Sequence, residues 1–127
     1  QLLFKESEEF GINSGLNIID GSVKKFKSYQ DGTVKYPVPQ VGWNKILKNI
    51  LPWDKTSLCE NNDGEFMYFV HSYYVEPDDE KVILSNTIYG DKKYCSSINY
   101  ENIFATQFHP EKSDKLGLKL IENFILI

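Results

Sequence analysis

Residues 102–127 read NIFATQFHPEKSDKLGLKLIENFILI, and within this stretch a β-strand pattern changes to a helical one. Residues 102–108 read as a buried strand that ends just before His109. After Pro110 a helix is predicted to begin near Ser113 or Asp114. Its apolar residues fall on one stripe at helical spacing: Leu116, Leu120, Ile121 and Phe124. A buried strand that leads into an amphipathic helix indicates an α/β domain.

The segments before this stretch add further strands to the prediction. Residues 66–75 form a nearly unbroken aromatic and β-branched run, which predicts a strand covered on both faces. Residues 82–89 and 94–98 are expected to form a hairpin. Two prolines, which cannot donate ladder hydrogen bonds, make residues 34–43 an edge strand or an extended loop. Turn signals such as Asp31-Gly32 separate these segments.

Two more helices are expected in the first half of the chain. Residues 1–10 have an apolar and an acidic side, and Gly11 supplies a stop signal. Because this helix has no N-cap residue, we expect the chain to begin mid-protein. Residues 45–51 have apolar positions at helical spacing before Pro52. The predicted fold class is therefore α/β, with a mixed open sheet flanked by helices.

The length and composition describe one globular domain over residues 1–127. The chain is long enough to bury roughly two-thirds of its unfolded surface in one core. Its 41% hydrophobic and 25% charged residues place it outside the range of disordered chains. The net charge of −4 argues against a nucleic-acid partner. The apolar runs are shorter than the roughly 20 residues of a membrane-spanning helix, so we expect a soluble, cytoplasmic protein.

The residues with the clearest potential for chemistry are His109 and Glu111, in the loop between the last strand and the last helix. In an extended segment residues i and i+2 share a face, so the carboxylate can fix the imidazole tautomer and stabilise its charged form. This is the orienting role of the third member of a nucleophile, base and carboxylate triad. The alternative is a strand-end histidine bonded to backbone, with Glu111 at the surface.

The two cysteines are poor candidates for the nucleophile of such a triad. Cys59 lies beside acidic residues, whose charges disfavour a thiolate. Cys95 lies in an expected strand without the glycines that a nucleophile elbow needs. Their spacing also fits neither a zinc site nor a disulfide framework. The residues alone therefore predict a base and its orienting acid, with no nucleophile inside the chain.

Four motifs, in order along the chain, resemble those of one enzyme family. They are QLLF at 1–4, VGWN at 41–44, YFVHSY at 68–73 and FHPEKS at 108–113. Over essentially all 127 residues the sequence resembles the class I, triad-type glutamine amidotransferases, most closely the glutaminase subunits of imidazole glycerol phosphate synthase. The resemblance implies the C-terminal portion of a single flavodoxin-like domain. The family's nucleophile lies in a Gly-x-Cys-x-Gly-x-Gln-Leu-Leu-Phe elbow, so its cysteine is expected four positions upstream of Gln1.

The resemblance implies a role for each matching residue of the glutaminase site. His109 would be the general base that takes the thiol proton and later protonates the leaving ammonia, and Glu111 would orient it. Gln1 and Glu9 match positions that bind the substrate glutamine, Glu9 through the ammonium group. The strand that lines the glutamine site is matched by His71, Ser72 and Tyr73. From the residues alone, Glu9 also fits a solvated helix face, and His71 a buried core histidine.

The resemblance further implies a face that docks on the barrel subunit of a synthase. Its matching residues are Trp43, Asn44, Tyr68 and Lys112. In the family this partner receives ammonia through a channel, and docking activates glutamine hydrolysis. From the residues alone, Trp43 fits a core position equally well.

The implied activity is hydrolysis of glutamine to glutamate, with ammonia delivered to imidazole glycerol phosphate synthase in histidine biosynthesis and with no metal or organic cofactor. One departure bears on the pathway, because Gln40 stands where the histidine-pathway subunits have His. The alternative acceptor is an amidating enzyme of bacterial surface-sugar synthesis. Two other classes stay open, a catalytically inactive binding module and a free-standing hydrolase of γ-glutamyl bonds. We expect the 127-residue piece alone to be inactive.

Overall fold

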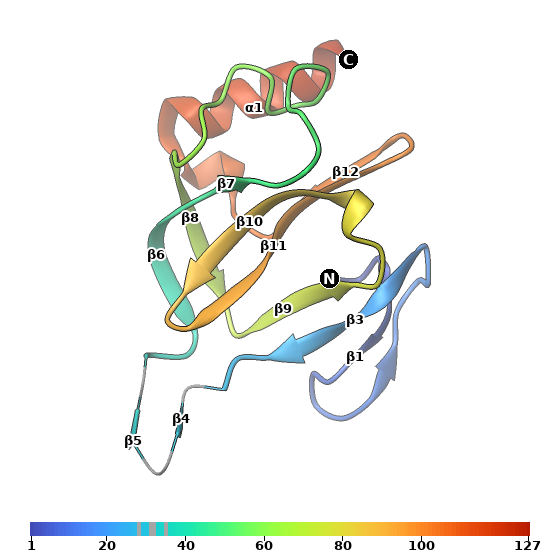
Figure 1. The fold of residues 1–127 in the computed structure, drawn as a ribbon, viewed down its shortest axis with the longest axis vertical. Coiled ribbons are helices and arrows are strands. Elements are labelled where there is room, and N and C mark those ends of the chain that lie inside the picture. The colour runs from blue at the N-terminus through green and yellow to red at the C-terminus, as the bar shows by residue number, and fades with distance from the viewer. Residues whose placement is uncertain (28, 31–32, 35) are drawn as a thin grey trace.

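The computed structural model describes residues 1–27, 29–30, 33–34 and 36–127 (Figure 1). Its elements, where η marks a 3-10 helix, are β1 (Phe4–Ser7), β2 (Asn13–Ser14), β3 (Ile19–Lys25), β4 (Tyr29–Gln30), β5 (Thr33–Val34), β6 (Gln40–Lys45), β7 (Leu47–Lys48), β8 (Phe66–His71), β9 (Tyr73–Pro77), η1 (Glu80–Val82), β10 (Ile83–Tyr89), β11 (Lys92–Tyr100), β12 (Ile103–Thr106), η2 (Pro110–Lys112) and α1 (Asp114–Leu126). The turn expected at Asp31-Gly32 lies outside the described residues.

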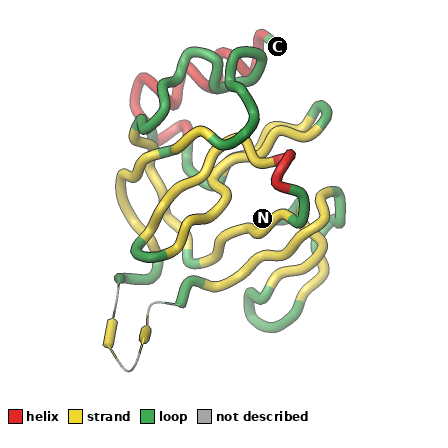
Figure 2. The backbone as a smooth tube through the Cα atoms, viewed as in Figure 1, coloured by secondary structure: helices red, strands yellow, loops and turns green. Residues whose placement is uncertain are grey.

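Most strands form one mixed sheet in the order β2-β1-β3-β9-β11-β10-β7, with β12 also paired to β11. β1 and β3 run parallel, and the other pairs of this sheet are antiparallel. β6 and β8 form a separate antiparallel pair. Figure 2 shows α1 at one end of the molecule beside the loop between β7 and β8, and strands make up most of the remainder. The fold is therefore mixed α/β, mostly strand, with the α-helix of the described residues at the C-terminal end.

The core consists of two apolar clusters on opposite faces of the sheet. Tyr74 and Tyr94 belong to the larger cluster, which includes residues of β8, β10 and α1. Their chain neighbours Val75 and Cys95 belong to the second cluster. This assignment follows from the pleat, because successive residues of a strand point to opposite faces.

The hairpin and the last helix are confirmed. β10 and β11 pair antiparallel from Ile83↔Ile98 to Tyr89↔Lys92. Gly90 closes the turn at φ 61°, and a Cβ there would clash with the ring of Tyr36. α1 begins at Asp114, as predicted, but of its expected apolar stripe only Leu120 is buried, whereas Ile121 is half-buried and Leu116 and Phe124 are exposed. Among the described residues no helix is long and apolar enough to cross a bilayer.

The helix expected over residues 1–10 is wrong. Phe4–Ser7 is instead a strand that pairs with β2 on one side and β3 on the other. Phe4 is buried, whereas Phe10 is 97% exposed, so the apolar stripe that suggested a helix is not packed as one face. Hydrogen bonds to neighbouring strands replace the local helical ones, and tertiary context overrides propensity.

The short helix expected over residues 45–51 is also wrong. This segment continues from β6 into β7, which pairs with β10. Ile46 donates its N–H to the carbonyl of Glu65, and Gly64 donates its own N–H to the carbonyl of Ile46. The backbone groups that a helix would use are therefore taken by another part of the chain.

The strand predictions need smaller corrections. Residues 66–75 form two strands, β8 and β9, separated by Ser72. β8 is buried on one face only, with Met67 and Phe69 inside and Phe66 half-exposed. β12 is half-buried rather than buried, because it pairs with β11 alone. The two prolines precede β6 and stay outside its ladder, in agreement with the prediction of an extended segment there.

Candidate active site

The loop that follows β12 is held firmly against β8. The ring of Phe108 is buried and packs on Phe69 with ring centroids 5.8 Å apart. The next residue, His109, donates its backbone N–H to the carbonyl of Tyr68 at 2.9 Å. Ser113 Oγ accepts from the N–H of Tyr68 at 2.9 Å and donates to the carbonyl of His109 at 2.6 Å. These contacts fix the backbone on both sides of the imidazole.

His109 and Glu111 form the pair that their spacing predicted. Nδ1 of His109 lies 2.8 Å from Oε1 of Glu111. Partial burial acts to raise the pKa of the Glu111 carboxyl, but hydrogen bonds from its own backbone N–H and from His109, with the charges of His109 and Lys112, lower that pKa overall. An ionised carboxylate only accepts hydrogen bonds, so Nδ1 carries the proton.

The opposite nitrogen of His109 is consequently the basic one when the ring is neutral. Nε2 makes no hydrogen bond to any residue within the described ranges. An imidazole with one nitrogen oriented by a carboxylate and the other unoccupied has the arrangement of a general base in a triad.

The five residues expected to bind substrate line one surface pocket of about 470 Å³. They are Gln1, Glu9, His71, Ser72 and Tyr73. Segments far apart in the sequence meet here, because the turn between β8 and β9 faces the start of the chain and the end of β12. The pocket also includes Gln107, two residues before His109. Neither His109 nor Glu111 itself lines the pocket, and Gln107 is the lining residue closest to them in the sequence.

Gln107 is a pocket residue that sequence reasoning missed. Nε2 of Gln1 donates to Oε1 of Gln107 and to the carbonyl of Tyr73, both at 2.9 Å. The signal was present, since residues two apart in an extended segment share a face and Gln107 precedes His109 by two.

His71 is both a pocket residue and a buried histidine with two partners. Nδ1 lies 2.7 Å from the carbonyl of Tyr73, and Nε2 lies 3.2 Å from the hydroxyl of Tyr94. Burial, with a further contribution from the charge of His109, lowers the pKa of His71 to about 4, although the hydrogen bond to Tyr73 opposes this shift. The ring is therefore neutral near pH 7.

Glu9 lies at the rim of the pocket, in the turn between β1 and β2. Its backbone N–H donates to Ser7 Oγ, and its carbonyl accepts from Asn13 Nδ2. Its carboxylate makes no ion pair with the described residues. It is thus available to a cationic group.

Three of the four residues expected at a partner interface form one exposed cluster. Trp43 is 52% exposed, which excludes the core position. Its ring meets that of Tyr68 edge-on with centroids 6.0 Å apart, and Nζ of Lys112 lies 6.0 Å from the Tyr68 ring centroid. The fourth residue, Asn44, lies at the adjacent strand position and donates from Nδ2 to the carbonyl of Ile88 at 2.8 Å.

Neither cysteine is placed to serve His109. Burial raises the pKa of the Cys95 thiol to about 12, so it remains protonated. Cys59 is an exposed free thiol in the turns that contact α1 through Ser57. Within the described ranges, no three His, Cys, Asp or Glu side chains are grouped so that they could hold a metal ion.

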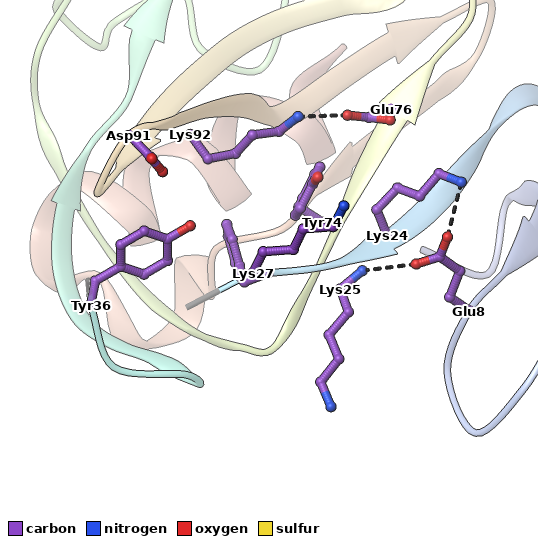
Figure 3. A pocket seen from close by; sticks show the side chains of 10 residues that line it. Glu8, Lys24, Lys25, Lys27, Tyr36, Tyr74, Glu76, Asp91 and Lys92 are labelled. Carbon is purple, nitrogen blue, oxygen red and sulfur yellow. Dashed lines mark hydrogen bonds and ion pairs between the residues drawn. The ribbon is translucent and has the colours of Figure 1, made fainter. Parts of the chain in front are cut away.

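A second pocket of about 610 Å³ lies beside β3, whose Lys24 and Lys25 line it (Figure 3). Lysines and tyrosines line most of it. Lys24 pairs with Glu8 at 3.0 Å and Lys92 with Glu76 at 2.6 Å, so carboxylates balance two of its lysines. None of the candidate residues contributes to its lining.

Comparison with known proteins agrees with this geometry. The family model described as glutamine amidotransferase class-I matches residues 1–127. The chain belongs to the class-I glutamine amidotransferase family. The imidazole glycerol phosphate synthase subunit HisH of Geobacter sulfurreducens is 45% identical over 125 residues, covering 98% of this chain. The HisH proteins of Methanocaldococcus jannaschii and Chlorobaculum tepidum are 48% and 42% identical, again over 98% of this chain. The chain spans 58% of the length of each of these three relatives.

Proposed function

We propose that the complete protein hydrolyses glutamine to glutamate and delivers the ammonia to imidazole glycerol phosphate synthase in histidine biosynthesis. The observation that carries the proposal is the His109–Glu111 pair, 2.8 Å apart, beside a pocket lined by the expected glutamine-binding residues. The similarity to HisH proteins over the whole chain supports the choice of pathway.

The proposed mechanism is acyl transfer through a cysteine four positions before Gln1 in the complete protein. His109 Nε2 takes the thiol proton, and the thiolate attacks the side-chain carbonyl carbon of glutamine. The same nitrogen then protonates the departing amide nitrogen, which leaves as ammonia from a glutamyl thioester. Water, deprotonated by His109, hydrolyses the thioester to glutamate and the free thiol. The negative charge of Glu111 stabilises each imidazolium state.

The pocket supplies groups for the two ends of the substrate. The Glu9 carboxylate at the rim suits the α-ammonium group of glutamine, since it has no competing ion pair in the described chain. Gln1, held by two hydrogen bonds, presents a fixed amide beside the turn at Ser72. We assign substrate binding to this set of residues.

The exposed β6–β8 face is the proposed docking surface for the synthase barrel. Besides the cluster of Trp43, Tyr68 and Lys112, it exposes Val41 and Val70, which are cross-strand neighbours. Exposed aromatic and aliphatic side chains gathered on one face are typical of interaction sites. The backbone N–H of His109 donates to the carbonyl of Tyr68, so a partner docked on this face would lie close to the catalytic histidine. We further propose that ammonia passes to the partner here and that the heterodimer acts in the cytoplasm.

The test is glutamine hydrolysis by the full-length protein with and without its barrel subunit. We expect ammonia release to be slow alone and to rise by roughly 100-fold or more when the barrel subunit is added, because docking completes the site. Equal rates in both samples would favour a free-standing hydrolase, and no hydrolysis in either would favour a binding module. If only an amidating enzyme of surface-sugar synthesis activated glutamine hydrolysis, the alternative pathway would be favoured.

A further inference from the structure

A chain of buried polar side chains runs behind the candidate glutamine pocket. Gln40 on β6 is the cross-strand neighbour of His71 on β8. The hydroxyl of Tyr94 on β11 lies 2.9 Å from Oε1 of Gln40 and 3.2 Å from Nε2 of His71. Gln40 is 2% exposed, Tyr94 3% and His71 8%. These side chains therefore hydrogen-bond within the protein and not to bulk water.

The chain reaches the pocket through one carbonyl group. The carbonyl of Tyr73 accepts from Nδ1 of His71 at 2.7 Å and from Nε2 of Gln1 at 2.9 Å. The position of this carbonyl therefore depends on the ring of His71, and the orientation of the Gln1 amide depends on the carbonyl.

The chemistry of the groups fixes where the hydrogens lie. A carbonyl only accepts, so Nδ1 of His71 carries a proton. In a neutral ring Nε2 then has none, and it must accept from the hydroxyl of Tyr94. Burial raises the pKa of Tyr94, so its single proton stays on the oxygen and is used in this bond. Thr87 also hydrogen-bonds this hydroxyl, but Thr87 Oγ1 donates its single proton to the carbonyl of Lys45 at 2.9 Å. The hydrogen bond that the Tyr94 oxygen accepts must therefore come from Gln40.

Gln40 can meet this requirement only with its amide nitrogen. As placed, its oxygen faces Tyr94, and its Nε2 is buried without a partner among the described residues. A rotation of the amide by a half-turn keeps its shape and presents a donor to the tyrosine oxygen. A protonated His71 would need the opposite order, with Tyr94 donating to the amide oxygen. Glutamine, which presents either end, fits both states, and this versatility distinguishes it from a carboxylate.

We propose that Gln40 and Tyr94 are positioning residues, which hold His71 as the neutral Nδ1–H tautomer and through the Tyr73 carbonyl set the orientation of Gln1 in the glutamine pocket. The functional consequence rests on the proposed glutaminase activity, whereas the tautomer does not. The chain thus couples position 40 to the Gln1 amide through four hydrogen bonds.

The first test reads the tautomer of His71 by ¹⁵N-edited NMR of the full-length protein, with the signal assigned by His71→Gln. We expect a neutral ring protonated at Nδ1 near pH 7. A neutral ring protonated at Nε2 would overturn the proposal, and this measurement needs no destabilising variant.

The second test asks whether the coupling passes through the tyrosine hydroxyl. Gln40→Glu offers only acceptors, so the Tyr94 proton turns away from His71 and the pKa of His71 rises. In the Tyr94→Phe background the same change should have a much smaller effect on that pKa. An equal rise in both backgrounds would mean that the charge at position 40 acts through space, which contradicts the relay. Gln40→Met removes the amide without adding an ionised acceptor, so it should not raise the pKa of His71 as Gln40→Glu does.

The third test measures steady-state glutamine hydrolysis with the barrel subunit. Tyr94→Phe should raise KM for glutamine by roughly three- to tenfold, with kcat nearly unchanged, because the buried hydrogen bonds of this hydroxyl to His71 and Gln40 are lost behind the binding pocket. Tyr89→Phe is the matched control, since that hydroxyl donates to the carbonyl of Pro37 and not to the relay. A KM equal to wild type in Tyr94→Phe would overturn the link to Gln1. Absence of hydrolysis in the wild type would refute the proposed function, and the NMR tests would still decide the relay.

Discussion

At the residue scale, the proposal depends on the different roles of His109 and Glu111. The carboxylate holds the proton on Nδ1 and leaves Nε2 as the base. The loop that carries the pair is held to β8 by the hydrogen bonds of His109 and Ser113 to the backbone of Tyr68, and not only by the contact between His109 and Glu111. A change at Glu111 should therefore alter the chemistry without moving the loop.

Glu111→Gln tests this division. The amide has the same shape but carries no charge, so it no longer stabilises the imidazolium that forms during thiol deprotonation. We expect kcat for glutamine hydrolysis in the activated complex to fall by roughly 100-fold or more, with the free energy of unfolding nearly unchanged. Glu122→Gln, a change at an exposed carboxylate of α1, is the control and should retain full activity. Full activity in Glu111→Gln would contradict the triad.

At the element scale, the pair could be predicted from the sequence because its members are only two residues apart, although Glu111 lies in η2 and not in the extended segment that the prediction assumed. The hairpin and α1 were predicted for the same reason, since their patterns are local. Residues 1–10 and 45–51 were assigned to helices because their apolar spacing fits one. Their backbones are used by distant strands, however, and nothing in those segments alone shows this.

The pocket could not be built from the sequence pattern either. It requires the β8–β9 turn, the first residues and the end of β12 to meet, which is a property of the sheet order. The family resemblance identified five of the lining residues, whereas the hydrophobic pattern of the sequence did not indicate that they are neighbours in space. The hydrogen-bond partners of His71, Tyr94 on β11 and Tyr73 on β9, could not be predicted from the sequence either.

Burial of His71 among these strands makes the free energy of unfolding depend on pH. Its pKa is about 4 in the folded protein, below the ordinary value of 6.5, so the unfolded state binds the proton first as the pH falls. The free energy of unfolding should be undiminished above pH 6.5 and should decrease between pH 6.5 and 4, by about 3 kcal/mol in total from this group.

Urea denaturation of wild type and His71→Gln at several pH values between 7 and 4 measures this contribution. The glutamine variant does not titrate, so its stability should decrease less over the same interval. The difference between the two proteins cancels the contributions of the other titratable groups. Parallel pH profiles would show that His71 titrates normally in the folded state.

At the scale of the whole molecule, the pocket and the docking face are continuous, because Val70 of β8 belongs to both. Trp43→Ala should weaken binding of the barrel subunit by roughly tenfold or more, because a central exposed aromatic side chain dominates the energy of many interfaces. Calorimetric titration of the barrel subunit measures the change in Kd. Ile50→Ala removes a side chain that is 72% exposed and lies outside this face, so its Kd should equal that of wild type. An unchanged Kd for Trp43→Ala would place the partner on another surface.

The most direct measurement is covalent labelling of the full-length protein with a chloroketone analogue of glutamine, followed by peptide mapping. The account predicts one carbon–sulfur bond, formed with loss of chloride at the cysteine four positions before Gln1. It also predicts slower labelling in His109→Asn, since the thiolate loses its base. Labelling at Cys59 or Cys95, or labelling that does not depend on His109, would contradict it.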